Sequence, residues 1–130
     1  MPPLPGSPVI DMGSDPDSAA FSYDERGPGY TRVSGDHVDV GATELQLVAS
    51  GTPVNISSVV KSANGPFQLS INNDPGVSLR VLASTNLTAP GTNWSFIGFA
   101  TENPSGSGHY SFADPQATNY KQRFYRVKSP

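Results

Sequence analysis

The chain has 130 residues, of which 13 are glycine and 13 are proline, while only 15 % are charged. Average soluble proteins contain about 12 % glycine plus proline and about 25 % charged residues, so the composition disfavours long helices and favours a turn-rich, all-β domain. The absence of cysteine excludes disulfides, thiolate metal sites and cysteine nucleophiles. A chain of this length suits one domain with one core.

Charge is distributed unevenly along the sequence. Residues 1–44 carry eight acids against two arginines, a net charge of −6, whereas the remainder carries three acids against six bases, a net charge of +3. Opposite charges of this kind can orient copies head to tail or hold the acidic part on its own domain. A solvated acidic tail is the simpler alternative. The first residues contain neither a basic start nor an apolar run, so no signal peptide and no membrane insertion are expected.

Residues 1–29 are predicted to form an extended arm. Proline and glycine crowd its first half, acids follow, and a Gly-Pro-Gly sequence at 27–29 ends it. No hydrophobic periodicity runs through this part. Residues 30–130 are predicted to form the β domain, with the strongest signal over 52–130.

Short alternating runs predict the strands, which in chain order are 30–40, 44–49, 54–60, 67–72, 77–83, 94–101, 109–112 and 123–127. Turn signals separate the later strands at 63–66, 73–76 and 103–108. Their spacing of about 8 to 14 residues is typical of an antiparallel β-sandwich. No helix longer than about two turns is predicted, because no stretch keeps the helical spacing of apolar residues.

Four sequence blocks in the second half of the chain form a familiar series. They are residues 81–87 (VLASTNL), 93–95 (NWS), 108–115 (GHYSFADP) and 122–127 (QRFYRV). In this order they resemble the fibronectin type III-like or immunoglobulin-like module near the C-termini of large secreted and surface proteins of Verrucomicrobia and related bacteria. The resemblance covers about residues 65–130. It implies a β-sandwich and an extracellular, cell-surface or particle-associated location, but no particular activity.

The candidate core follows from residue size and alternation. Trp94 has the largest apolar area in the chain, and in β-sandwiches such a residue fills the space between the sheets. A ligand platform is the alternative for this side chain. The other core candidates are Phe67, Leu69, Ile71, Leu79, Val81, Phe112, Tyr125 and Val127.

Residues 123–127 and Asp114 predict polar contacts near the end of the sequence. Alternation places Tyr125 and Val127 on one face of the strand and Arg126 on the other. We expect the Tyr125 hydroxyl to donate to the backbone and Arg126 to pair with Asp114. Asp114, which precedes a proline, also predicts a turn whose later N–H groups bond its carboxylate.

Few residues point to ligand chemistry. Asp11, Asp15 and Asp17 are the candidates for a Ca²⁺ site, because Ca²⁺ accepts carboxylates from loops, although their spacing is not that of an EF-hand. No other metal and no cofactor is expected. The sequence has no catalytic motif, so we do not expect an enzyme. Its net negative charge argues against nucleic-acid binding.

Two functions remain open at this point. The first is a non-catalytic structural or interaction module that works by protein contacts, in self-assembly or in decoration of a surface, extracellular or virion structure. Residues 1–29 would bind the protein partner or a second copy. The alternative is a carbohydrate-binding module of a secreted polysaccharide-degrading enzyme. Sugar binding needs exposed aromatic rings, and the candidates for this platform are Tyr110, Tyr120 and Phe124.

Overall fold

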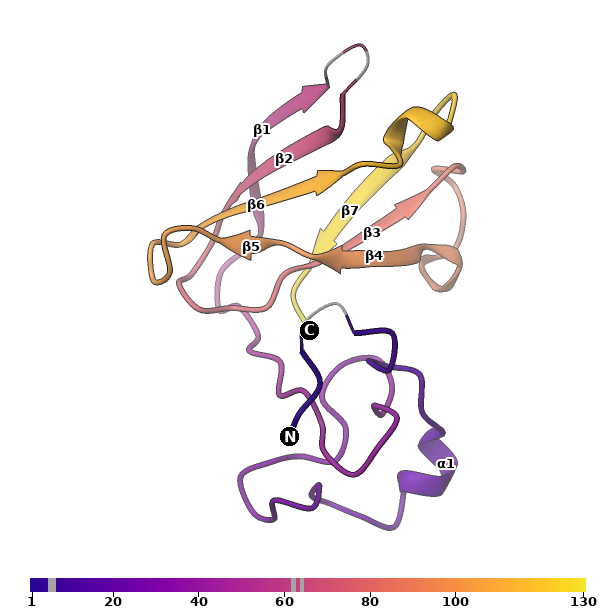
Figure 1. Cartoon of the computed structure of the whole chain (residues 1–130), viewed down its shortest axis with the longest axis vertical. Coiled ribbons are helices and arrows are strands. Elements are labelled where there is room, and N and C mark those ends of the chain that lie inside the picture. The colour runs from indigo at the N-terminus through magenta and orange to yellow at the C-terminus, as the bar shows by residue number, and fades with distance from the viewer. Residues whose placement is uncertain (5–6, 62, 64) are drawn as a thin grey trace. The chain divides into compact units, whose positions relative to one another are not determined.

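The computed structural model covers the whole chain and describes residues 1–4, 7–61, 63 and 65–130. It divides into two compact units, Met1–Val48 with Pro130, and Ala49–Ser129 (Figure 1). The predicted boundary between residues 29 and 30 therefore differs from this division and lies inside the first unit. The turn predicted at 63–66 includes residue 64, which is outside the described residues.

Within the described part of the second unit, seven strands form two antiparallel sheets (Figure 1). The first sheet has the order β1-β2-β6-β5 and consists of β1 (Asn55–Lys61), β2 (Phe67–Asn72), β6 (His109–Asp114) and β5 (Thr101–Glu102). The second has the order β4-β3-β7 and consists of β4 (Ser95–Phe99), β3 (Arg80–Ser84) and β7 (Phe124–Lys128). Two 3₁₀ turns, η1 (Gly91–Asn93) and η2 (Ala117–Asn119), lie in the connections. The prediction of an all-β chain with two antiparallel sheets and almost no helix is confirmed.

Strand β2 illustrates how the sequence pattern produces these sheets. Successive side chains of a strand point to opposite faces, so Phe67, Leu69 and Ile71 share one face. Leu69 and Ile71 are buried, whereas the polar residues that alternate with them are exposed. The period of two in the sequence therefore becomes one apolar and one polar face.

One hydrophobic core contains residues from both sheets. Its buried members are Leu69, Ile71, Val77, Leu79, Val81, Ala100 and Tyr110, and Val54, Phe67, Ile97, Phe112, Tyr125 and Val127 pack against them. The predicted core residues lie in this shared core, with the exception of Trp94.

Two contacts determine which strands face each other across the shared core. The rings of Phe67 in β2 and Tyr125 in β7 stack with their centroids 4.0 Å apart, so β7 lies across from β2. A Cβ atom on Gly98 in β4 would come within 3.0 Å of the Phe112 ring in β6, so β4 lies across from β6. Gly98 also has a φ of 146°, which other residues rarely adopt. Glycine fits this position because it has no Cβ atom and adopts such a φ readily.

The first unit folds without a sheet. Its described residues contain one short helix, α1 (Asp15–Ser18), and one isolated bridge between Tyr23 and Thr31. The strands predicted at 30–40 and 44–49 do not form there, beyond that bridge.

The reason lies in the backbone hydrogen bonds of those two stretches. The N–H group of Val38 donates to Asp15, and that of Leu45 donates to Asp39. The N–H group of Leu47 donates to the Ser34 hydroxyl. Because side-chain oxygens accept these N–H groups, they are not available for the ladder of a sheet.

Residues 1–29 are part of the same folded unit in the structure, not an extended arm. The N–H of Gly13 donates to the Val38 carbonyl at 2.7 Å, and the N–H of Val40 donates to the Val9 carbonyl at 2.9 Å. Because such bonds connect the predicted arm to residues 38–42, contacts of the arm with a partner would have to come from its exposed side chains.

Candidate functional site

Buried carboxylates organise the N-terminal unit. Asp24 is buried, and its carboxylate accepts the N–H groups of Arg26 and Glu44 at 2.8 and 2.9 Å. The Arg26 guanidinium donates to the same carboxylate and holds the pKa of Asp24 well below its usual range. Arg26 also lies over the ring of Tyr30, 4.1 Å from its centroid. These bonds join residues 24–30 to the loop at 44.

The carboxylates of Glu44 and Asp39 play the same role in this unit. Glu44 is fully buried, and its two oxygens accept the N–H groups of Ser34 at 3.2 Å and Asp39 at 3.0 Å. Burial raises the pKa of Glu44, while Arg32 lies 3.6 Å away and supplies a countercharge. The Asp39 carboxylate accepts the N–H of Asp11 at 2.9 Å. In this unit, carboxylate oxygens thus accept backbone N–H groups that the carbonyl groups of a neighbouring strand would accept in a sheet.

The proposed Ca²⁺ ligands have other contacts in the structure. Asp11 Oδ1 accepts the N–H groups of Asp36 and His37, both at 3.1 Å. Asp15 binds His37 Nδ1 at 2.6 Å, a contact that raises the pKa of His37 and lowers that of Asp15. Asp17 is exposed. Among the described residues, no group of three or more His, Asp or Glu side chains is arranged to hold a metal ion.

The N-terminal unit also exposes large apolar side chains. Met12, Phe21 and Val40 are 69 %, 64 % and 52 % exposed, and they line one hollow of about 430 Å³ together with the buried Val38. We call Met12, Phe21 and Val40 the N-terminal apolar surface. Asp17 is among the polar residues that line the same hollow. Apolar patches with a polar rim commonly mark protein contact sites.

Asp114 is the centre of a polar network in the second unit. Its Oδ1 accepts the N–H of Gln116 at 3.0 Å, which forms the predicted turn, and its Oδ2 accepts the Tyr125 hydroxyl at 2.9 Å. The ion pair comes from Arg123, whose Nη1 lies 3.1 Å from Asp114, and not from Arg126 as predicted. Alternation explains the difference, because Arg123 shares the core-facing side of Tyr125 and Arg126 points to the opposite face.

This network also changes the properties of Tyr125. Its hydroxyl donates to the Asp114 carboxylate and not to the backbone, as the sequence had suggested. Burial and, to a smaller extent, the hydrogen bond to Asp114 together raise the pKa of Tyr125 to about 12. A different tyrosine, Tyr110, makes the backbone contact, because its hydroxyl donates to the Asp74 carbonyl at 2.8 Å.

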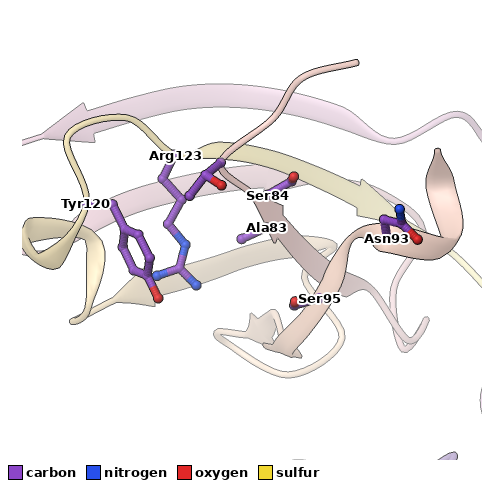
Figure 2. A pocket seen from close by; sticks show the side chains of 7 residues that line it. Ala83, Ser84, Asn93, Ser95, Tyr120 and Arg123 are labelled. Atoms are coloured by element: carbon purple, nitrogen blue, oxygen red, sulfur yellow. The ribbon is translucent and has the colours of Figure 1, made fainter. Parts of the chain in front are cut away.

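A polar pocket of about 260 Å³ lies beside this network (Figure 2). Figure 2 shows Tyr120 and Arg123 at one side of the pocket and Asn93 at the opposite side. The Arg123 guanidinium lies over the Tyr120 ring, 4.3 Å from its centroid. Because the cation covers one face of the ring and pairs with Asp114, the pocket offers polar groups but no broad aromatic surface.

The structure separates the residues of the predicted sugar platform. Tyr110 is buried in the shared core, so its ring is not available at the surface. Tyr120 is 39 % exposed and Phe124 is half-buried. The three rings therefore do not form one exposed platform.

Trp94 lies in a different place from the one predicted. It is buried, and its indole N–H donates to the Ala89 carbonyl at 3.1 Å. The Arg126 guanidinium lies over its ring, 4.5 Å from the centroid. Since Arg126 points away from the shared core, Trp94 covers the opposite face of the sheet β4-β3-β7 and does not fill the space between the sheets.

The buried carboxylates of Asp24, Asp39 and Glu44 were not predicted from the sequence. One local signal was present for Asp24, because an aspartate side chain often accepts the backbone N–H two residues later, here that of Arg26, and so favours a turn. The partners of Asp39 and Glu44 come from distant parts of the chain, and no local spacing reveals them.

Comparisons of this chain with models of protein families, with curated proteins and with solved structures find no match. No helix in the described part of the chain is long and apolar enough to cross a membrane.

Proposed function

We propose that this chain is a non-catalytic interaction module, a β-sandwich of the fibronectin type III or immunoglobulin type joined to an acidic contact unit. It acts by protein–protein contacts in self-assembly, as part of a surface, extracellular or virion-associated structure. The observation that carries the proposal is the N-terminal apolar surface of Met12, Phe21 and Val40, which are more than half exposed. Such surfaces in soluble proteins commonly mark binding sites.

The strand order supports the assignment of the sandwich type. Immunoglobulin constant-type domains pair strands A, B, E and D in one sheet and C, F and G in the other. The order β1-β2-β6-β5 matches A-B-E-D, and β3 next to β7 matches C next to F, with β4 at the other side of β3.

The charge distribution supports association between copies. The N-terminal 44 residues carry a net charge of −6 and the remainder carries +3. Opposite patches steer association at low ionic strength and are screened by salt. The apolar contact on the acidic unit of one copy is therefore matched by the basic second unit of the next copy.

The proposal is tested by sedimentation velocity of the full chain from micromolar to near-millimolar concentration. We expect concentration-dependent association that weakens in high salt. Phe21→Asp should shift the chain to monomer, since it places a charge in the apolar contact. Val33→Asp is the matched control, because Val33 is 45 % exposed in the same unit but does not line the hollow. A chain that stays monomeric at every concentration, or two variants that behave alike, would overturn the proposal.

A further inference from the structure

The polar pocket of the second unit lies at one end of the sheet β4-β3-β7. β3 ends at Ser84, which pairs with the first residue of β7, and Ala83 pairs with the first residue of β4. Tyr120 and Arg123 come from the segment before β7 and complete the lining (Figure 2). The antiparallel strand order therefore gathers side chains from three separate stretches of the chain around one hollow of about 260 Å³.

The Arg123 guanidinium is nearly buried and keeps unused hydrogen-bond donors. Its side chain is 10 % exposed, and a guanidinium carries five N–H donors. Its contacts with the described residues are the ion pair with Asp114 at 3.1 Å and the face of the Tyr120 ring. The ion pair is not aligned as a hydrogen bond, because the buried Nη1 has no hydrogen-bond partner in the protein. Buried donors without an acceptor are unfavourable, so oxygen atoms of a ligand in the pocket would be stabilising.

Two hydroxyl groups in the same pocket are also available. Ser95 and Tyr120 line it, and neither side-chain hydroxyl has a hydrogen bond to another described residue. Figure 2 shows Ser95 across the pocket from Tyr120. A hydroxyl group both donates and accepts. The pocket therefore offers hydrogen bonds from two sides to one small ligand.

The charge of the pocket favours a neutral ligand. Among the described residues that line it, Arg123 is the one charged side chain, and Asp114 balances that charge. A carboxylate or a phosphate group in the pocket would approach Asp114 and leave a net negative charge in partly buried surroundings. Such a charge is unfavourable unless it is paired.

The size and the lining of the pocket narrow the choice further. Pockets for drug-sized ligands measure about 300 to 1,000 Å³, so a hollow of about 260 Å³ suits a single ring. Arg123 covers one face of the Tyr120 ring, which leaves little aromatic surface for an apolar ligand. A sugar ring carries hydroxyl groups that donate and accept around its edge, and it matches these groups without any stacking.

We infer that this pocket binds one neutral hexose unit of a glycan. Oxygen atoms of the sugar accept N–H groups of Arg123, and its hydroxyl groups bond the hydroxyls of Ser95 and Tyr120. This inference goes beyond the proposed function, because it concerns the second unit and a small ligand, whereas self-assembly concerns the N-terminal apolar surface.

The test is NMR of the full, ¹⁵N-labelled chain titrated with the methyl glycosides of glucose, galactose and mannose to about 100 mM. We expect at least one of them to bind with a Kd of about 1 to 10 mM, because few atoms make contact and water competes for the same hydrogen bonds. The Nε–H signal of Arg123 and the amide signals of Ser84 and Ser95 should shift. Glycerol at equal hydroxyl concentration is the control and should not shift them.

Glucuronate provides the charge control, because it adds a carboxylate to the same ring. We expect it to bind more weakly than the neutral glycosides. Binding of a neutral sugar should also be unchanged between low and high salt, whereas contacts between charges are screened by salt.

Two tyrosines provide matched variants. Tyr120→Phe keeps the ring beside Arg123 but removes a hydroxyl of the pocket, and we expect it to weaken binding at least about threefold. Tyr23→Phe makes the same change at a ring that is 48 % exposed in the first unit, and it should leave binding within about 1.5-fold. Circular dichroism verifies that both variants are folded.

Arg123→Lys tests the guanidinium itself. It keeps a positive charge beside Asp114 but loses the planar group with its five donors, so we expect binding to weaken at least about tenfold. Ser95→Ala is a milder change at an exposed residue of β4, and Ser111→Ala at an exposed residue of β6 is its control. This pair decides the question if Arg123→Lys does not fold.

Four results would overturn the inference. They are the absence of shifts with all three glycosides, shifts confined to residues away from the pocket, equal binding by the two tyrosine variants, and tighter binding of glucuronate than of any neutral glycoside. The last result would assign the pocket to a carboxylate. Phe21→Asp should leave sugar binding unchanged, so this test and the test of self-assembly fail independently.

Discussion

Tyr125 in β7 donates its hydroxyl to the carboxylate of Asp114 in β6 at 2.9 Å, although the two strands belong to different sheets. Asp114 is also 3.1 Å from Arg123, and the Tyr125 ring stacks on Phe67 of the first sheet. Both the ring and the hydroxyl of one residue therefore connect the two sheets.

Removal of that hydroxyl should destabilise the second unit. In Tyr125→Phe the stacked ring remains, but Asp114 loses a hydrogen bond, and a bond to a charged group contributes about 1.5 to 3 kcal/mol. We expect the free energy of unfolding to fall by about 1.5 kcal/mol, the lower end of this range, because Arg123 still neutralises the carboxylate. Urea unfolding followed by Trp94 fluorescence measures the difference. Tyr120→Phe, at a ring that is 39 % exposed, should change stability by less than about 0.5 kcal/mol.

The same hydroxyl predicts a dependence of stability on alkaline pH. Burial and the bond to Asp114 together raise the pKa of Tyr125 to about 12, whereas a tyrosine in the unfolded chain ionises near 10. The raised pKa means that the stabilisation is fully present below pH 10 and is lost as pH rises from about 10 through 12. The difference in free energy of unfolding between wild type and Tyr125→Phe should shrink over this range. A difference that stays constant would contradict the assigned bond.

Glu44 gives a test of the carboxylates in the N-terminal unit. Both of its oxygens accept backbone N–H groups, from Ser34 and Asp39. Glu44→Gln keeps the shape but turns an NH₂ group toward one of these donors, which leaves buried polar groups unsatisfied at a cost of about 1 to 3 kcal/mol. We expect faster hydrogen exchange at the amides of the first unit. Glu25→Gln, at an exposed residue of the same unit, should leave exchange unchanged.

The contact between His37 and Asp15 predicts a measurable titration. The hydrogen bond to Asp15 raises the pKa of His37 above its ordinary value of 6.5. The contact therefore stabilises the unit fully below pH 6.5, and its contribution is lost as pH rises through the raised pKa. NMR of the imidazole ring should show this midpoint, and Asp15→Asn should move it back toward 6.5. An unchanged midpoint in that variant would contradict the contact.

Much of the second unit could be predicted from sequence, because its strands follow a period of two. Phe67, Leu69 and Ile71 already form one face in the sequence, and the structure places them in the shared core. The same alternation would have selected Arg123 as the partner of Asp114, since residues 123 and 125 share a face. The size of Trp94 indicated burial, but size does not tell which face of a sheet a residue covers.

The N-terminal unit could not be predicted in this way. Its structure depends on single carboxylates that accept N–H groups far away in the chain, such as Asp11 with the backbone at Asp36 and His37. Such bonds impose no periodicity, and the many prolines and glycines resemble a disordered segment. The composition therefore suggested an arm where the structure has a unit with buried acids.

The contact between Arg126 and Trp94 yields the last prediction. The guanidinium lies 4.5 Å from the centroid of the ring and covers it from solvent. Arg126→Gln removes the cation and exposes the ring, so we expect the emission of Trp94 to shift to the red and quenching by iodide to increase. A cation–π contact at an exposed residue contributes about 0.5 to 1 kcal/mol, and urea unfolding should show a loss of this size. Lys121→Gln removes an exposed charge away from the indole and serves as the control. Unchanged emission and quenching in Arg126→Gln would show that Arg126 does not cover the indole, and would also remove the argument that Trp94 lies on the outer face of the sheet.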